Sequence, residues 1–563
     1  MNIRRWRQGL CLCLLTLLLS GCSLQGLFPF LRPDAPIAAT TELEPAVTTE
    51  LSPVRESLYE LTCVDRDLES WDLQGDLLVG ARGDFYGDRE HPLELTVCNV
   101  DQDVLLCRRT VTLDPDQWGF DVKFHDAGIL LTVYREGEEE QLFFDLSLEL
   151  LEIQPPASES STFTSPFFPD WDLNDYESYT GKGFLGLVLR EDPEKLYLWE
   201  EEDLDWSVSA ADSGLFLLSR TDWQEDGESA THLAVLDPRQ GVLVNCLDLD
   251  GSLGWYNGSA LTRERALLYQ GGEGEDPGFL IWEFNRDAIS RPLPIRTHTM
   301  ETMVEKRDRL ARTMTETYGV DFRFLPWSID MNGWSDDYPF GLEEEKAPAP
   351  LPEYDFLKQT DEILKQFPQG ILRESYDLDW AEGLDFYVVN SIVTDNVGAF
   401  ATNQNGRIAA VFPTGFGAYN VPHELMHCME YRFWDQLDYN LDDEWYALNP
   451  EDFSYLYGEE TPEAYEPYRI WSEDPETWRF FSDYAMTNEL EDRAVTFERL
   501  FNSAQDPEPP DWTGSPGLMA KAQLLCRALR EAYPSAAAAE TLPWEKWVTT
   551  NDSGNDSVVS AFP

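Results

Sequence analysis

The pattern of apolar residues changes its period near residue 299, and this change divides the chain into two kinds of structure. Between residues 59 and 290, short alternating or continuous apolar runs recur, as at 93–97 and 129–133, and acidic, glycine-containing turns separate them. From 299 onward, beginning with 303–318, apolar residues fall at helical spacing. The sequence therefore predicts a multidomain protein in which an all-β domain precedes an α+β domain.

Several segments of the β-rich half share one form, a strand followed by an acidic hairpin and a second strand. Residues 130–144, 215–236 and 267–284 are examples, and their starts lie about 50 or 85 residues apart. This spacing suits blades of about 40–50 residues with insertions. We therefore expect a propeller-like domain over residues 59–290, in preference to a sandwich.

A short motif in the second half points to chemistry. Residues 423–427 read His-Glu-Leu-Met-His, in a chain with only 6 histidines. On a helix, His423 and His427 lie one turn apart on the same face, where they can bind Zn²⁺ while Glu424 acts as the base. Asn420 and Pro422 favour a helix start just before the motif. The alternative interpretation is a solvated helix that happens to carry two histidines.

A catalytic zinc usually takes a third protein ligand, and no other histidine follows residue 299. Cys428 is discounted because it follows His427 directly and leaves the ligand face. Glu430 lies about one turn further along and stays open on spacing. Glu491 opens a second helical pattern and is the favoured candidate. However, Asn488 three residues before Glu491 also resembles a capping box, in which Glu491 would only bond the backbone.

The second helical pattern resembles the second active-site helix of gluzincin peptidases of the anthrax lethal factor type. The matching positions are Tyr484, Thr487, Asn488, Glu489, Glu491, Ala494 and Phe497. The resemblance covers roughly residues 299–540 and implies a zincin-like fold. It also implies that His423, His427 and Glu491 bind Zn²⁺, that Glu424 is the general base, and that Tyr484 reaches the substrate oxygen.

One position departs from this family. Many gluzincins have an acidic residue four positions after the ligand glutamate, where it orients a zinc-binding histidine, but this chain has Val495. Such partners tune the basicity of the ligands. Asp492, Glu498 or a backbone carbonyl would have to take this role.

The start of the chain resembles a bacterial lipoprotein signal. Residues 1–22 combine a basic beginning, an apolar stretch too short for an ordinary membrane span, and Leu-Ser-Gly-Cys ending at Cys22. Lipid on Cys22 would anchor the protein to the extracellular face of the bacterial membrane. The alternative is a plain secretory signal. The composition of residues 23–58 predicts a flexible tether, and the composition of residues 549–563 predicts a disordered tail.

The net charge of −64 argues against nucleic acid as a partner, because two strongly negative surfaces repel each other. Of the cysteines beyond the signal, Cys98 and Cys107 flank an expected hairpin and are candidates for a disulfide.

These observations predict a membrane-anchored extracellular zinc metalloendopeptidase that hydrolyses peptide bonds with a zinc-activated water. Its gluzincin-like metallopeptidase domain would span 299–548, and its β domain would position a peptide or protein substrate. The alternative is a non-catalytic surface lipoprotein that binds a protein or glycan through the β domain, with a structural or degenerate zincin domain.

Overall fold

The computed structural model describes residues 58–548, except 65–67, 84–90, 115–116, 126–127, 136–137, 152–164, 168–175, 213, 224–228, 251–258, 263, 271–277, 285–290, 334, 336, 395–396, 415–416 and 458–460. The expectations for the signal segment with Cys22, the tether up to residue 57 and the tail 549–563 concern residues outside this part. No helix among the described residues has both the length and the apolar character needed to span a bilayer.

The first half of the described chain is built from strands. In chain order they are β1 (Leu58–Glu60), β2 (Ser70–Gln74), β3 (Leu77–Gly83), β4 (His91–Asn99), β5 (Val104–Leu113), β6 (Gln117–His125), β7 (Gly128–Arg135), β8 (Glu138–Phe144), β9 (Tyr176–Gly181), β10 (Phe184–Leu189), β11 (Leu196–Glu200), β12 (Ser207–Asp212), β13 (Leu215–Trp223), β14 (Ser229–Asp237), β15 (Val242–Asp250), β16 (Ser259–Leu261), β17 (Arg265–Gln270), β18 (Gly278–Glu283) and β19 (Arg296–His298). The all-β prediction for this half is confirmed.

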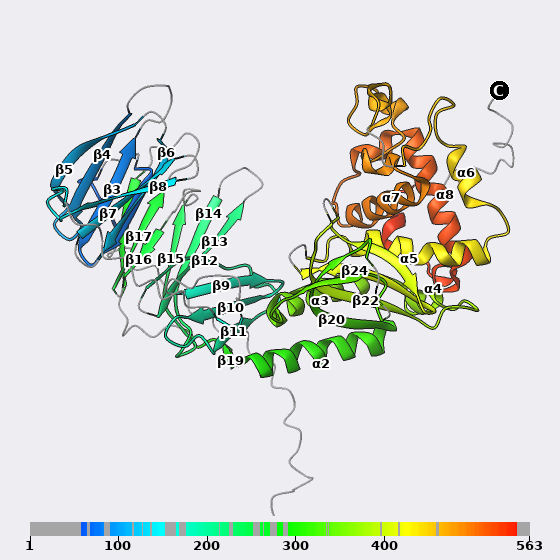
Figure 1. The fold of residues 1–563 in the computed structure, drawn as a ribbon, viewed down its shortest axis with the longest axis horizontal. Coiled ribbons are helices and arrows are strands. Elements are labelled where there is room, and N and C mark those ends of the chain that lie inside the picture. Colours follow the sequence, from blue (N-terminus) through cyan, green and yellow to red (C-terminus); the bar gives the residue numbers. More distant parts are fainter. Residues whose placement is uncertain are drawn as a thin grey trace, which may run out of the picture. The chain divides into compact units, whose positions relative to one another are not determined.

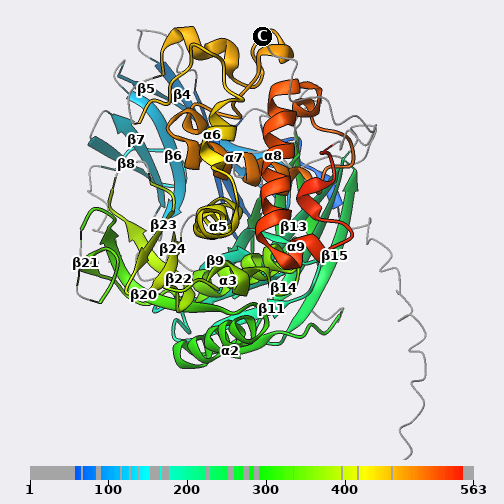
Figure 2. The same cartoon turned by 90° about the vertical axis from the view of Figure 1, so that its right-hand side faces the viewer.

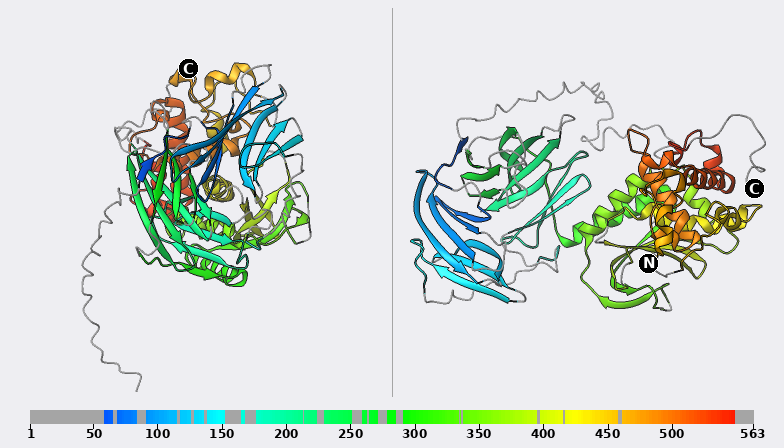
Figure 3. Two further views of the ribbon diagram at one scale, coloured as in Figure 1. Left: turned by 90° about the vertical axis from the view of Figure 1, so that its left-hand side faces the viewer. Right: turned by 90° about the horizontal axis from the view of Figure 1, so that it is seen from above.

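These strands form successive small antiparallel sheets, drawn from blue to green in Figure 3. The sheet orders are β2-β3-β4-β5, β6-β7-β8, β19-β11-β10-β9, β12-β13-β14-β15 and β1-β18-β17-β16. The first strand of the region therefore pairs with its eighteenth, Leu58 opposite Trp282. Alternate residues of the strands, such as Leu93, Leu95 and Val97 of β4, are buried in cores between the sheets.

Cys98 and Cys107, the candidates for a disulfide, do not pair, and no disulfide forms among the cysteines of the described part. The strand register separates the two candidates. Cys107 lies opposite Val97, whereas Cys98 lies opposite Leu105. The thiol of Cys98 instead donates to the carbonyl oxygen of Cys63, at 3.3 Å.

The second half contains both helices and strands. The elements are α2 (Met300–Tyr318), β20 (Val320–Asp330), β21 (Gly341–Glu345), α3 (Pro350–Leu364), α4 (Ile371–Ser375), β22 (Gly383–Ile392), β23 (Phe400–Gln404), β24 (Arg407–Pro413), α5 (Val421–Gln436), α6 (Leu441–Tyr446), α7 (Glu489–Ser503), α8 (Pro516–Ala532) and α9 (Pro534–Ala538), together with the 3₁₀ turns η4 (Glu463–Tyr468), η5 (Pro475–Thr477), η6 (Tyr484–Met486), η7 (Asp511–Gly514) and η8 (Pro543–Glu545). The strands form one mixed sheet in the order β21-β20-β22-β24-β23.

The two faces of this sheet bury different sets of side chains, as the alternation of a strand requires. Phe386 and Val388 of β22 and Phe412 of β24 face the main helical core, whereas Val389 and Val411 belong to a smaller core on the other face. Helix α5 lies on the helical side, between the sheet and helices α7 and α8 (Figures 1 and 2). The sheet therefore serves as the platform for α5.

The two edges of this sheet are formed by short strands. Strand β21 pairs with β20 at one edge and is followed closely by α3. Strand β24, just before α5, is internal. Strand β23 lies outside β24 and forms the edge beside α5.

Candidate metal centre

Helix α5 presents the two histidines of the motif on one face. Their ring centroids lie 5.0 Å apart, one helical turn along the axis. Leu425, Met426 and Met429 on the same helix are fully buried in the core, and they fix the rotation of α5. Asn420 is at the N-cap position, but its side chain makes no capping hydrogen bond.

Helix α7 brings Glu491 to the same point. Its Oε2 atom lies 3.1 Å from Nε2 of His423 and 3.2 Å from Nε2 of His427. One potential ligand atom from each of the three residues lies within 4.8 Å of the others. The structure therefore brings together the three residues to which the sequence assigned metal binding.

The start of α7 separates the two interpretations of Glu491. The side-chain oxygen of Asn488 accepts hydrogen bonds from the backbone N–H groups of Leu490 and Glu491, both at 2.9 Å. Asn488 is thus the N-cap, but the carboxylate of Glu491 points to the histidines. Because the cap leaves this carboxylate free, the capping-box interpretation of Glu491 is wrong.

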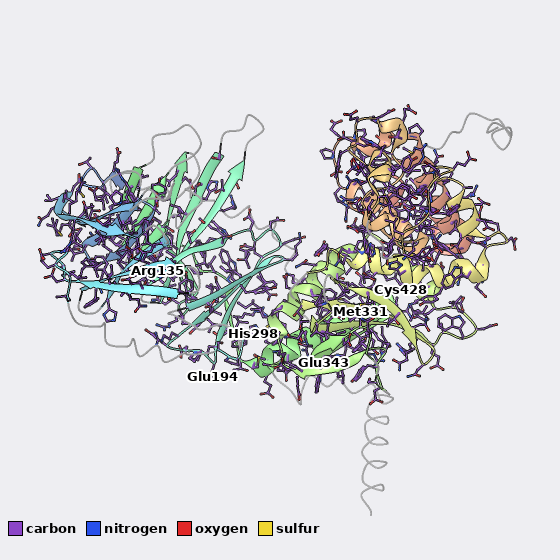
Figure 4. All side chains as sticks on the ribbon, turned by 45° about the horizontal axis from the view of Figure 1, so that its top comes forward. Arg135, Glu194, His298, Met331, Glu343 and Cys428 are labelled. Carbon is purple, nitrogen blue, oxygen red and sulfur yellow. The ribbon has the colours of Figure 1, made fainter. Side chains whose placement is uncertain are left out.

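The other ligand candidates lie elsewhere. Both carboxylate oxygens of Glu430 accept hydrogen bonds from the buried Arg493, at 2.8 and 2.9 Å. Cys428, labelled in Figure 4, is fully buried in the core. A carboxylate held on both oxygens by a guanidinium is committed to that ion pair. Glu430 therefore joins α5 to α7 and does not enter the cluster.

Asp492, a candidate for orienting a histidine, also has a structural role. Its Oδ2 accepts hydrogen bonds from Lys521 at 2.6 Å and from Trp445 and Tyr455 at 2.8 Å each. Asp492 and Lys521 are both fully buried. This network ties α7 to α8 and to the loop before η4.

Glu498 supplies the carboxylate beside His423 that Val495 cannot supply. It lies two helical turns after Glu491 on α7, and its Oε2 is 3.3 Å from Nδ1 of His423. A carboxylate at this atom keeps a proton on Nδ1, so that Nε2 is the nitrogen available to a metal ion. Among the three substitutes that the sequence offered, the structure selects Glu498.

Glu424 lies beside the cluster with its carboxyl group buried. Its Oε2 has no hydrogen-bond partner among the residues that the structure describes. Burial raises the pKa of Glu424 to about 7, although the two neighbouring histidines act in the opposite direction. A buried carboxylate without a partner is costly in a folded protein. Such a group is expected where it serves a reaction.

The cluster itself is strongly polarised. Burial alone would lower the pKa of His423, but hydrogen bonds to Glu491 and Glu498 outweigh it and raise this pKa to about 10. The pKa of His427 is raised for the same reason, by Glu491. Burial would raise the pKa of Glu491, yet the histidines lower it to about 2. In the metal-free cluster the Glu491 carboxylate therefore stays ionised and the His423 imidazole is protonated at neutral pH, and the carboxylate also favours the protonated form of His427.

Tyr484, in turn η6, lies at the open side of the cluster. Its ring centroid is 6.0 Å from that of His423, and 55% of its surface is exposed. Desolvation and the charge of Glu491 raise the pKa of its hydroxyl, so the group stays a hydrogen-bond donor at neutral pH. Tyr484 is positioned to meet a molecule that enters from solvent.

The donor set fits a zinc ion. Two imidazole nitrogens and one carboxylate oxygen are the ligands of a three-coordinate protein site that leaves further positions for water or substrate. The unpartnered oxygen of Glu424 beside them is a second feature that a bound ion and its water would explain. His423, His427 and Glu491 are the residues that would hold the ion.

A hollow of about 270 Å³ opens on the cluster. Glu424, His427, Tyr484 and Glu491 are among its lining residues. Further lining residues that the sequence did not single out come from α5, α7, β23 and neighbouring loops: Met331, Val397, Phe400, Tyr431, Trp434 and Leu490. A larger hollow of about 930 Å³ surrounds Trp471 and contains none of the cluster residues.

Comparison with known proteins adds little. No family model matches the chain, and no curated protein matches it. Among solved structures, similar ones include the β-propeller domain of the Trilobed protease from Pyrococcus furiosus (10% identity, 38% of this chain and 92% of that one, TM-score 0.17) and the acylaminoacyl peptidase of Pyrococcus horikoshii (9% identity, 57% and 72%, TM-score 0.19). The catalytic domain of the GH62 α-L-arabinofuranosidase of Coprinopsis cinerea is similar at the same level (10% identity, 40% and 95%, TM-score 0.18). Likenesses this weak identify no function.

Proposed function

We propose that this chain is a zinc metallopeptidase of the gluzincin type. The observation that carries the proposal is the meeting of His423, His427 and Glu491 around one point, with the buried, unpartnered Oε2 of Glu424 beside it. The histidines and the glutamate come from two different helices and are 64 or more residues apart in sequence. A solvated helix with two incidental histidines would not need such an arrangement.

The residues around the cluster have separate roles in peptide hydrolysis. A bound zinc ion supplies Lewis acidity, which makes water more acidic and the scissile carbonyl more electrophilic. Glu424, with a pKa near neutrality, accepts the proton of the attacking water and passes it to the leaving amine. The hydroxyl of Tyr484 donates a hydrogen bond to the carbonyl oxygen of the substrate as charge develops on that oxygen. Glu498 holds His423 in the orientation that the cluster requires.

In this proposal, the remaining parts of the chain determine where the peptidase acts and how it holds its substrate. Lipid on Cys22 anchors the protein to the extracellular face of the bacterial membrane, and the tether separates the folded part from the surface. The β domain is propeller-like and positions a peptide or protein substrate. Its succession of small antiparallel sheets, with β1 and β18 paired in the same sheet, supports this interpretation.

The test begins with metal content and ends with cleavage. Purified protein should contain about one zinc ion per chain, and Glu491→Ala should lose most of it. Glu424→Gln should keep its zinc but lose at least about 100-fold in cleavage of a diverse peptide library. The exposed Glu540 gives a matched control, and Glu540→Gln should leave both properties unchanged.

Two results would overturn these assignments. Full zinc content in Glu491→Ala would remove Glu491 from the ligands. A zinc-loaded protein that cleaves no peptide, or a Glu424→Gln variant as active as the wild type, would reject the peptidase. The alternative of a non-catalytic surface lipoprotein that binds through its β domain would then be preferred.

A further inference from the structure

The hollow beside the metal cluster has two kinds of lining side chains. One kind is the acidic and imidazole groups of the cluster. The other kind is apolar and aromatic: Met331, Val397, Phe400, Tyr431, Trp434 and Leu490. Among the described residues, no lysine or arginine lines the hollow, and Glu430 on its wall is already paired with Arg493. Outside the cluster, the described lining therefore offers chiefly apolar contact.

The aromatic wall, formed by Tyr431 and Trp434, is built on the same helix as the two histidines of the cluster. Tyr431 and Trp434 follow His427 by four and seven residues, and helical geometry places these three positions on one face of α5. Their distance from the cluster is thus fixed by a rigid element rather than by a loop. A recognition site of this kind needs no rearrangement before it binds.

The wall is also held in place before any ligand arrives. The rings of Tyr431 and Trp434 meet edge to face at 5.5 Å, and Trp380 meets Tyr431 in the same way at 5.5 Å. The hydroxyl of Tyr431 accepts a hydrogen bond of 2.8 Å from Asn403 on the edge strand β23. These contacts connect α5 to the strand that forms the other side of the hollow.

Trp434 is nevertheless 60% exposed. Because this ring also lines the hollow, its exposed face is available for contact with a molecule that enters. The size of the hollow, about 270 Å³, lies below that of cavities which enclose whole drug-sized ligands. It suits one large side chain that belongs to a longer molecule.

Building on the proposed peptidase function, we propose that this hollow is the specificity subsite and takes a large apolar side chain of the substrate, such as phenylalanine or leucine. The side chain would pack on Trp434 and Tyr431 while the scissile bond lies at Glu424 and Tyr484. His427 lines the hollow and His423 does not, so the selected side chain lies on the His427 side of the cluster.

The experiment compares peptides that differ in one side chain next to the scissile bond: phenylalanine, leucine, alanine or lysine. The full-length, zinc-loaded protein should cleave the phenylalanine peptide with a kcat/KM at least about tenfold above that of the alanine peptide. Trp434→Ala should reduce this ratio by about tenfold or more, and Trp434→Phe should restore most of it. Trp471, 69% exposed and outside this hollow, supplies the matched control, and Trp471→Ala should keep the ratio.

A second arm measures binding without cleavage. In Glu424→Gln, the phenylalanine peptide should bind more tightly than the alanine peptide by fluorescence polarisation, and Trp434→Ala should abolish the difference. Equal cleavage of all four peptides, or a preference for lysine, overturns the subsite while the peptidase stands. If no peptide is cleaved, the peptidase fails, and the binding arm alone decides the subsite: equal binding of the two peptides rejects it.

Discussion

Zinc binding to the metal-free protein should release protons, and the structure sets how many. In the metal-free cluster the pKa of His423 is about 10, because hydrogen bonds to Glu491 and Glu498 outweigh burial. A pH of 7.5 lies about 2.5 units below this pKa, so the imidazole is almost fully protonated. The pKa of His427 is also raised. Because zinc binds only neutral imidazole, each ion should displace about one to two protons.

The magnitude follows from the same values. Removing a proton from His423 at pH 7.5 costs about 3 kcal/mol, which lowers the apparent zinc affinity by the same amount. The sign is fixed, since the raised pKa favours the protonated, metal-free state at low pH. Apparent affinity should therefore rise as the pH rises, by about tenfold per pH unit for each proton displaced.

Isothermal titration of zinc into chelator-stripped, full-length protein measures this release. The observed heat is compared in two buffers of equal pH and different ionisation enthalpy, and the slope gives the protons released per ion. Glu498→Gln removes one of the groups that raise the pKa of His423, so it should release fewer protons. Glu540→Gln should match the wild type. Identical heats in both buffers, with equal affinity at pH 6.5 and 8.5, would refute the reasoning.

Three further outcomes are expected. Tyr484→Phe should keep its zinc but lower kcat for peptide cleavage by about 10²–10³-fold, because a donor to the developing oxyanion is lost; an unchanged kcat would exclude this role. Asn488→Ala should lower the free energy of unfolding by about 1 kcal/mol in urea, since two N–H groups at the start of α7 lose their partner, whereas Asn488→Asp should retain most of the stability. Glu430→Ala should cost about 3–5 kcal/mol in the same assay, because it leaves Arg493 charged and unpaired in the core, and a loss below 1 kcal/mol would contradict that account.

Local patterns in the sequence were sufficient for the elements that carry the cluster. The motif with Pro422 predicted α5, and Asn488 with the apolar spacing after it predicted α7. Glu498 could also be found from helical periodicity, because positions 491, 495 and 498 share one face. Its contact with His423 needed the packing of α5 against α7, which periodicity does not provide.

Other parts of the site depend on contacts between distant residues. Glu430 looked like a possible ligand because its partner Arg493 lies 63 residues away in sequence. Strand β23 has the sequence Phe-Ala-Thr-Asn-Gln, which is too short and polar to stand out as the edge strand. The aromatic wall likewise depends on Asn403 meeting Tyr431 across 28 residues. A single sequence gives no signal for such pairs.

Three consecutive residues at the start of α7 point to three different places. Glu491 faces the histidines, Asp492 faces Lys521, and Arg493 faces Glu430. Successive side chains on a helix are turned by about 100°, so these contacts together specify the rotation and the axial position of α7. The segment 437–483 that leads to α7 takes part in this positioning, because Trp445 and Tyr455 donate hydrogen bonds to Asp492. Insertions or a backbone cut within 437–483 should therefore be tolerated only where they spare these two residues and the buried aromatic side chains of the segment, Phe453, Trp478, Phe480 and Phe481.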